Sequence, residues 1–176
     1  MILQQPLFAP ESSWSVPDIF PQFSETETVA IDLETYDPHL MTCGPGWATG
    51  RGHVVGIGVA TKDWEGYFPI RHEGGGNLDE EIVLRWLTTL LKSTTREVVF
   101  HNALYDVGWL RREGVIVHGK ILDTIIAAPL LNENRFSYSL DNLGIEYCDE
   151  RKDESLLKNA ALAFGINPKS EMYKLH

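Results

Sequence analysis

The sequence predicts an α/β fold with a mixed central sheet, in which three antiparallel strands are followed by parallel strands, flanked by helices. Three apolar segments follow one another within residues 28–70, which favours antiparallel neighbours. Helical apolar stripes then alternate with strand-like segments, as is typical of α/β domains. The length of 176 residues suits one domain with its own hydrophobic core.

The first strands are predicted over residues 28–33, 53–61 and 64–70. The glycine-rich segment GPGWATGRG, residues 44–52, is predicted to be a loop between the first two of them. Residues 1–27 contain four prolines among aromatic residues, which indicates an extended N-terminal arm packed on the domain.

The second part of the chain alternates between helices and strands. The predicted elements are a helix over residues 78–92, a strand over 97–100, a helix from Asn102 to about Glu113, a short strand over 115–117, and helices over 122–131, 139–147 and 153–164. Asn102 is a suitable N-cap, and Gly165 is a suitable stop for the last helix.

The composition is that of a globular protein with 43% apolar and 23% charged residues. No apolar stretch is long enough to cross a bilayer, and the N-terminus does not resemble a signal peptide, so no membrane partner and a cytoplasmic location are expected. The net charge of −10 disfavours a protein that holds duplex DNA mainly through its phosphates.

Two carboxylates stand one residue apart at the end of the first predicted strand, in VAIDLETYDP. Because side chains alternate along a strand, Asp32 and Glu34 share a face and repel each other unless a cation lies between them. A strand end that runs into solvent is the simpler explanation, and a metal site is the functional one.

A third carboxylate, Asp106, lies in HNALYDVGWL. With Asn102 as N-cap, Asp106 falls in or near the first helical turn, where the helix dipole favours a carboxylate by roughly 0.3–1 kcal/mol. Leu104, Val107 and Leu110 are expected to form the buried stripe, which leaves Asp106 on another face.

These three carboxylates offer the hard oxygen ligands that Mg²⁺ and Mn²⁺ prefer. Two such ions about 3.5–4 Å apart stabilise the attacking and leaving oxygens of a phosphodiester displacement. Asp32 is the expected bridging ligand, with Glu34 on one ion and Asp106 on the other.

The segment IDLET followed by HNALYD resembles the first two motifs of the DEDD (DnaQ-like) 3′–5′ exonuclease family. ILDTIIAAPLL and YSLDNLG resemble its next segments, and KDESLLKNAALAFGINPKSEMY is similar to the proofreading exonuclease domain of bacteriophage family A DNA polymerases. The resemblance covers residues 28–176 and implies a ribonuclease H-like domain. It also implies a two-metal-ion 3′–5′ exonuclease that hydrolyses phosphodiester bonds at single-stranded DNA 3′ ends, in the host cytoplasm if phage-encoded.

The resemblance also implies site residues. Asp32, Glu34 and Asp106 correspond to catalytic metal ligands, and Thr35, Tyr36 and Asn102 lie where the family contacts the terminal nucleotide. For Thr35 and Tyr36, a capping turn with a packed tyrosine explains the residues equally well. For Asn102, helix capping alone is sufficient.

The family's third motif, Tyr-x3-Asp or His-x4-Asp, is not found where it belongs. His118 and Asp123 fit the string but come too soon after Asp106, so Asp123 is predicted to start a helix and His118 to lie on the surface or at a strand end. Residues 28–176 are therefore expected to lack the C-terminal helix that carries the fourth carboxylate and the general base.

Two hypotheses follow from this missing motif. In the first, the chain is an exonuclease that is part of a DNA polymerase, or is completed by a polymerase chain or a missing C-terminal segment. In the second, it is a catalytically incomplete module with an exonuclease fold that binds DNA or a polymerase, since loss of a general base typically costs about 10²–10⁴-fold in rate.

Overall fold

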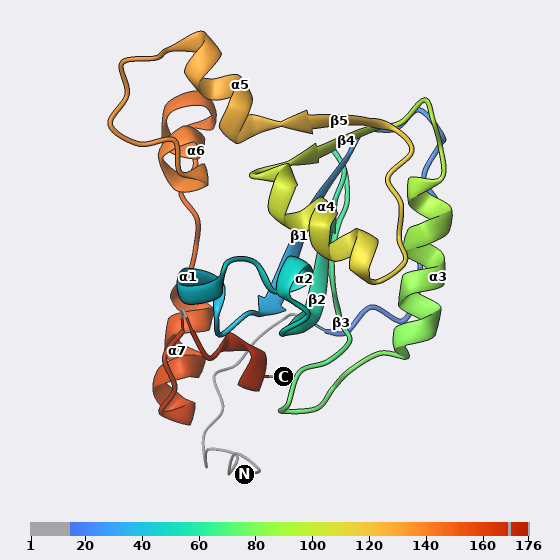
Figure 1. The fold of residues 1–176 in the computed structure, drawn as a ribbon, viewed down its shortest axis with the longest axis vertical. Helices are drawn as coiled ribbons and strands as arrows, with labels where there is room; N and C mark the ends of the chain where they lie inside the picture. Colours follow the sequence, from blue (N-terminus) through green and yellow to red (C-terminus); the bar gives the residue numbers. More distant parts are fainter. Residues whose placement is uncertain (1–14, 169, 176) are drawn as a thin grey trace.

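A five-stranded sheet with the order β3-β2-β1-β4-β5 forms the centre of the computed structural model, which describes residues 15–168 and 170–175 (Figure 1). Its strands are β1 (Val29–Tyr36), β2 (His53–Ala60), β3 (Glu65–Pro69), β4 (Glu97–Phe100) and β5 (Lys120–Asp123). β1, β2 and β3 pair antiparallel, whereas β4 pairs parallel with β1 and β5. The predicted mixed sheet is confirmed.

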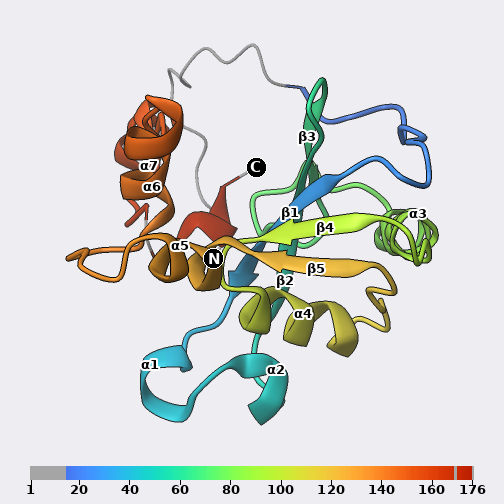
Figure 2. The same cartoon turned by 90° about the horizontal axis from the view of Figure 1, so that it is seen from above.

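Helices of different lengths surround the sheet. They are α1 (Leu40–Cys43), α2 (Gly46–Thr49), α3 (Glu80–Leu91), α4 (Ala103–Arg112), α5 (Thr124–Leu131), α6 (Leu140–Cys148), α7 (Ser155–Phe164) and the 3₁₀-helix η1 (Met172–Lys174). α3, with 12 residues, is longer than the other described helices. α6 and α7 both lie on the side of the molecule away from α3 (Figure 2), and Figure 1 shows α6 above α7 on that side.

One face of the sheet carries the hydrophobic core. Val29, Ile31 and Leu33 alternate along β1 as buried residues and pack with apolar side chains of α3 and α4. Fully burying one such side chain stabilises the fold by about 1.5–3 kcal/mol. Between them, Ala30 and Asp32 are exposed on the opposite face.

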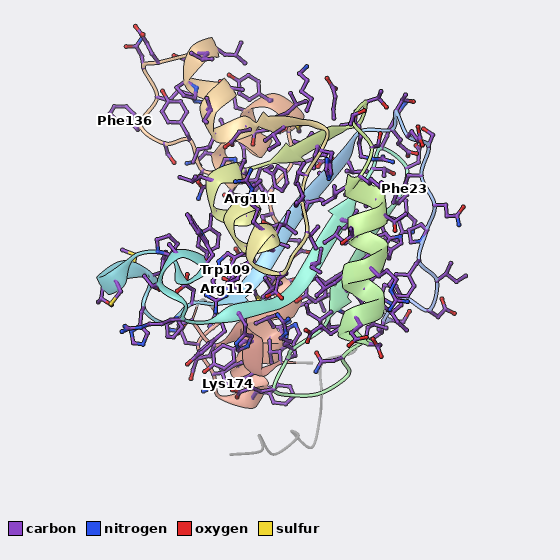
Figure 3. The ribbon with its side chains drawn as sticks, turned by 45° about the vertical axis from the view of Figure 1, so that its right-hand side comes forward. Phe23, Trp109, Arg111, Arg112, Phe136 and Lys174 are labelled. Atoms are coloured by element: carbon purple, nitrogen blue, oxygen red, sulfur yellow. The ribbon has the colours of Figure 1, made fainter. Side chains whose placement is uncertain are left out.

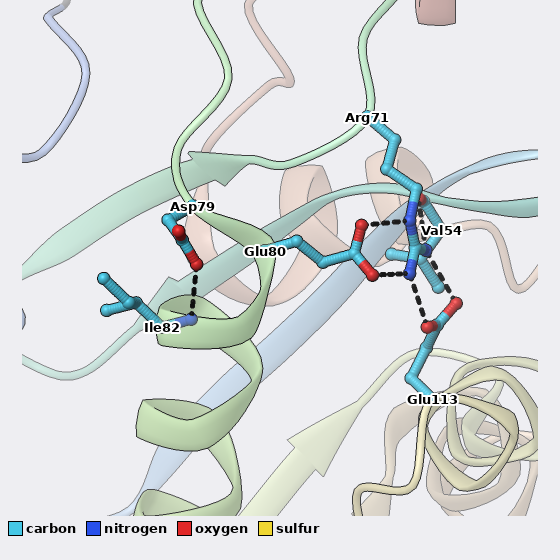
Figure 4. A network of polar contacts seen from close by, with 6 residues as sticks. All are labelled: Val54, Arg71, Asp79, Glu80, Ile82 and Glu113. Atoms are coloured by element: carbon cyan, nitrogen blue, oxygen red, sulfur yellow. Dashed lines mark hydrogen bonds and ion pairs between the residues drawn. The ribbon is translucent and has the colours of Figure 1, made fainter.

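An arginine network links the core helices to the sheet. Arg71 donates hydrogen bonds to Glu80, at the start of α3, and to Glu113, which caps the end of α4 (Figure 4). The same guanidinium donates to the backbone oxygen of Val54 in β2. This planar fork bonds two carboxylates at once, which a lysine could not reproduce.

The segment before β1 packs on the domain over its described part. Phe20 stacks on Phe68 of β3 with ring centroids 5.6 Å apart, and Trp86 of α3 donates its indole N–H to the backbone oxygen of Pro21 at 2.9 Å. The buried Arg96 donates to the backbone oxygen of Ser24 at 2.7 Å. Residues 1–14 of the expected arm lie outside the described residues.

One predicted element after α4 is wrong, because residues 115–117 form no strand. The predicted helix over 122–131 is present as α5, but it begins at Thr124, because the unpredicted strand β5 occupies Lys120–Asp123. Val115 is apolar because it is fully buried within a loop.

The glycine-rich segment 44–52 is not a plain loop, because α2 lies within it and α1 precedes it. Such single-turn helices are too short to show a periodic pattern in the sequence. Asp37 accepts a hydrogen bond from the Gly46 amide at 2.8 Å and so fixes the start of α2.

The region around α5 and α6 is apolar but largely uncovered. Its exposed side chains are Ile126, Leu130, Leu131, Phe136 and Leu140, and Phe136 projects away from the body of the protein (Figure 3). Among the described residues, no helix combines the length and apolar character needed to span a bilayer.

Candidate active site

The face of the sheet opposite α3 and α4 carries a row of aligned residues. In the strand register Asp32 of β1 pairs with Gly58 of β2, and Gly58 pairs with Tyr67 of β3. Side chains at paired positions point to the same face, so Asp32 and Tyr67 flank the glycine.

A cavity of about 880 Å³ opens on this face. Its lining includes Asp32 and Tyr67, together with His101 after β4, Thr124 after β5 and Leu140 of α6. This volume lies in the range of about 300–1,000 Å³ that small-molecule sites occupy, which is sufficient for a nucleotide.

Glu34 lies two residues after Asp32 and is partly buried. Its pKa is raised from 4.5 to about 7, first because burial disfavours the charged form and then because Asp32 is negative, while Lys152 acts in the opposite direction. Asp32 and Glu34 thus interact as two carboxylates on one strand face.

Asp106 reaches the same region from α4. Only 4% of its surface is exposed, and its Oδ1 accepts a hydrogen bond from the Leu33 amide of β1 at 3.2 Å. Its pKa is raised from 3.8 to about 7, mainly by burial and next by the charge of Asp32, while the hydrogen bond from Leu33 lowers it. Asp106 therefore lies against β1.

The expected buried stripe of α4 is wrong in two respects, because Leu104 is 75% exposed and Asp106 is buried on the packed face together with Trp109 and Leu110. The helix presents Asp106 to β1 because the Leu33 amide supplies a partner there. The carboxylate is therefore on the packed face of α4.

The arrangement of the carboxylates suits a cation that takes its remaining oxygen ligands from the substrate. Among residues 15–168 and 170–175, no group of three His, Cys, Asp or Glu side chains is placed to hold a metal ion by itself. Mg²⁺ usually binds proteins through only one or two carboxylates and takes its remaining oxygens from water and phosphate. The charge of Asp32 raises the pKa of both Glu34 and Asp106, and a bound cation would relieve this repulsion.

The stability of the metal-free protein is expected to fall as the pH rises from 5.5 to 8. Because Glu34 and Asp106 have pKa values of about 7 in the folded state, against 4.5 and 3.8 ordinarily, the folded state binds more protons than the unfolded state in this window. Loss of those protons destabilises the fold. The measurement is the melting temperature with chelator across this range.

The matched comparison for this pH dependence is Glu34→Gln, whose amide is neutral at every pH and should flatten the slope. The pKa of His53 is lowered, mainly by burial, so His53 makes stability rise with pH below pH 6.5. This contribution is the same in both proteins. An unchanged slope in Glu34→Gln would contradict the raised pKa of Glu34.

Thr35 and Tyr36 make internal contacts. A β-bulge between Glu34 and Thr35 shifts the register, and the Thr35 hydroxyl lies 2.8 Å from the Tyr105 hydroxyl of α4. The ring of Tyr36 packs 4.5 Å from that of Tyr173 and 5.3 Å from that of His53. The packed-tyrosine alternative thus describes the contacts of Tyr36, and substrate roles for both stay predictions.

Asn102 is the N-cap of α4, but its side chain makes no capping hydrogen bond. Its φ of 79° lies in the left-handed region, which asparagine tolerates better than most residues. Asp123 performs the capping instead, because its carboxylate accepts from the amides of Asn102 at 3.0 Å and Ala103 at 2.8 Å. The exposed amide side chain of Asn102 stays a candidate for substrate contact.

Asp123 also caps α5 by accepting from the Ile125 amide at 3.1 Å, so the sequence-based interpretation of Asp123 as a helix-start residue is confirmed.

His101 lines the same cavity as Asp32, and its hydrogen bond with Thr124 indicates which tautomer it adopts. The Thr124 hydroxyl donates its single proton to the backbone oxygen of Phe100 at 3.1 Å. The hydroxyl oxygen, 2.8 Å from His101 Nδ1, must then accept from that nitrogen. Nε2 of the neutral imidazole is therefore an acceptor.

Sequence reasoning missed Tyr67 and interpreted His101 only as a strand-end residue. Tyr67 lies opposite Gly58, and this register between β2 and β3 cannot be read from composition or spacing. The alternating glycines at 56 and 58 were the available signal, because they leave room on one face of β2.

The chain is similar to known proteins over most of its length. A family model described as 3′–5′ exonuclease matches residues 15–172. A DNA-directed DNA polymerase of Pseudomonas phage M6 is 41% identical over 98% of this chain and 27% of the relative, and DNA polymerase DpoZ of Salmonella phage PMBT28 is 30% identical over 84% and 21%. The chain spans about a quarter of the length of these curated relatives.

Solved structures share the fold. Brucella melitensis NrnC matches with a TM-score of 0.54 and 20% identity over 73% of this chain and 55% of that one. Escherichia coli RNase D, an exoribonuclease involved in structured RNA processing, matches with a TM-score of 0.52 and 16% identity over 85% and 35%. These neighbours confirm the ribonuclease H-like fold predicted from the sequence.

Proposed function

This chain belongs to the 3′–5′ exonuclease family, and from this premise we propose that it hydrolyses the terminal phosphodiester bond at DNA 3′ ends with two divalent cations. The observation that carries the proposal is the arrangement around Asp32. Its charge acts on both Glu34 and Asp106, which come from different elements, and Asp32 lines a cavity large enough for a nucleotide.

Asp32, Glu34 and Asp106 are proposed to hold the cations, which are Mg²⁺ or Mn²⁺. When bound, such ions polarise the phosphoryl group and lower the pKa of water to give a nucleophile. In this proposal the chain's own residues place the phosphate over β1. Asn102, and Thr35 and Tyr36 beyond the bulge, are proposed to contact the terminal nucleotide.

DNA is the proposed substrate because relatives that are 41% and 30% identical to this chain are phage DNA polymerases. We propose a proofreading role as part of a polymerase or as its partner. The third motif, which carries the fourth carboxylate and the general base, is not found in these 176 residues. In this proposal a further segment or chain supplies these two groups. RNase D acts on RNA, so single-stranded RNA is the matched alternative substrate.

The test is hydrolysis of a 5′-labelled single-stranded DNA oligonucleotide with Mn²⁺. A 3′–5′ exonuclease shortens the labelled strand in single-nucleotide steps, and chelator stops the reaction. Release of the 5′ label as a mononucleotide would contradict the polarity. Faster degradation of an RNA oligonucleotide of the same sequence would contradict the choice of DNA.

A binding module without catalysis is the second candidate. It is favoured by the absent third motif and by the finding that no three metal-binding side chains among the described residues form a site alone. This candidate predicts fluorescence anisotropy changes with single-stranded DNA or a polymerase, without Mn²⁺ binding in calorimetry. Mn²⁺ binding together with strand shortening would exclude it.

A further inference from the structure

Three side chains form a row on the open face of the sheet, at the ends of its parallel strands. β1 pairs with β4 at Ala30 and Val99, and two residues further along both strands the chain reaches Asp32 and His101. The row continues to Thr124 at the start of α5, whose hydroxyl lies 2.8 Å from His101 Nδ1. Neighbouring strands lie about 4.8 Å apart, and the three residues line the same cavity. His101 therefore lies one strand away from the proposed metal ligand Asp32.

The imidazole of His101 has one acceptor atom left for a ligand. Thr124 donates its proton to the backbone oxygen of Phe100, so Nδ1 of His101 is the donor to the Thr124 hydroxyl. The neighbouring backbone is held as well, because Asp123 accepts from the amide of Asn102 at 3.0 Å. Nε2 makes no hydrogen bond to any residue that the structure describes. Its lone pair is therefore available to a donor in the cavity.

The charges around this cavity select the kind of donor. The charged side chains in its lining are Asp18, Asp32 and Glu65, and no lysine or arginine among the described residues lines it. An ionised phosphate has no proton to donate to Nε2, and the carboxylates repel it wherever no cation lies between them. A neutral hydroxyl group fits both conditions. The hydroxyl groups of the terminal sugar belong to the same nucleotide as the phosphate that is proposed to bind at Asp32.

We propose that His101 is a substrate-binding residue whose Nε2 accepts a hydrogen bond from a hydroxyl group of the 3′-terminal sugar. Thr124 is a positioning residue, because its hydroxyl keeps the imidazole proton on Nδ1 and leaves the lone pair of Nε2 free. The inference rests on the proposed function, which places the phosphate of the terminal nucleotide at Asp32. The donor is the 3′-hydroxyl at a DNA end or the 2′-hydroxyl at an RNA end, since both offer the same O–H group.

The test is the affinity of the full chain for single-stranded oligonucleotides that differ only in the terminal sugar. The sugar carries a 3′-hydroxyl, a 2′-hydroxyl, both or neither, and the label is at the 5′ end. Fluorescence anisotropy is measured at pH 8 with Ca²⁺, whose longer ligand distances fill a carboxylate site without the strict octahedral geometry of Mg²⁺. Wild type is expected to bind one of the singly hydroxylated ends about 2- to 10-fold more tightly than the end with neither hydroxyl, as one hydrogen bond typically contributes.

Two substitutions separate the roles of the two residues. His101→Leu removes the acceptor and is expected to bind every oligonucleotide with the affinity of the end that lacks both hydroxyls. Thr124→Val keeps the shape of the side chain but cannot hold the Nδ1 proton, so its preference for the hydroxylated end should be reduced. His39→Leu is the matched control, because His39 is exposed and its side chain makes no hydrogen bond to a described residue. It should keep the wild-type preference, and thermal melts confirm that each variant folds.

A preference for the 3′-hydroxyl would assign the contact to a DNA end, whereas a preference for the 2′-hydroxyl would assign it to an RNA end. Equal affinity of wild type for all the oligonucleotides would overturn this inference alone, because the strand would then bind without a contact to the sugar hydroxyl. An unchanged preference in His101→Leu would also overturn it, and an unchanged preference in Thr124→Val would overturn the role of Thr124. Wild-type protein that binds none of the oligonucleotides would overturn the proposed function, and this inference with it.

Discussion

Replacing Asp32 with asparagine is expected to lower Mn²⁺-dependent hydrolysis of single-stranded DNA by about 10³-fold or more. A bound cation stabilises the charge of the phosphoryl transition state by several kcal/mol, and a tenfold change in rate corresponds to about 1.4 kcal/mol. Asp32 is the proposed ligand with the greatest effect, because its charge acts on both Glu34 and Asp106. The measurement is the initial rate of strand shortening at saturating Mn²⁺.

Asp63→Asn is the matched control for Asp32→Asn, because it removes one exposed carboxylate between β2 and β3 and changes the net charge equally. It should retain the wild-type rate. Asp106→Asn is expected to lower the rate to a similar degree as Asp32→Asn. Wild-type rates in both Asp32→Asn and Asp106→Asn would show that neither carboxylate takes part in the reaction.

Asp32→Asn also has an effect that does not depend on activity. Removing this charge takes away a repulsion that raises the pKa of Glu34 and Asp106. The metal-free variant should therefore melt at a higher temperature than wild type at pH 8, where both carboxyl groups are otherwise ionised. Removing a carboxylate that stabilises the fold would lower the melting temperature instead. This comparison therefore separates a functional carboxylate from a structural one.

The sheet was predictable because its strands are distinct in local composition. β4 occupies Glu97–Phe100 as predicted, and β2 begins at His53 as predicted. β5 was missed because Lys120–Asp123 runs directly into α5, with no turn residue between them, and only Asp123 and Thr124 separate the apolar residues of the two elements. The parallel pairing of Lys120–Asp123 with Glu97–Phe100 of β4 is what distinguishes the strand from the helix that follows it.

The candidate site was predictable only where a single element determines it. The two-residue period of a strand places Asp32 and Glu34 on one face without further information. The orientation of Asp106 depends on the Leu33 amide, which lies 73 positions earlier in the sequence, and apolar periodicity alone assigned it to the wrong face. The position of Tyr67 depends on the β2–β3 register in the same way.

Replacing Trp109 with alanine is expected to destabilise the protein by about 3–5 kcal/mol, which is the usual cost of deleting a fully buried tryptophan side chain. Trp109 is 0% exposed and lies on α4 beside Arg112, whose guanidinium is 5.5 Å from its ring centroid (Figure 3). A Cβ at Gly46 would lie only 2.9 Å from this ring, so the indole fills the space between α4 and α2. The measurement is the free energy of unfolding in urea.

Leu104→Ala on the same helix is the matched control and should change stability by no more than about 0.5 kcal/mol, because Leu104 is 75% exposed. Trp109 lies three residues after Asp106, so both side chains project from one side of α4 toward the body of the protein. A cavity at Trp109 would let α4 shift and weaken the hydrogen bond from Leu33 to Asp106. Mn²⁺ affinity should therefore fall in Trp109→Ala and stay normal in Leu104→Ala, since the tryptophan holds α4 and its carboxylate against β1.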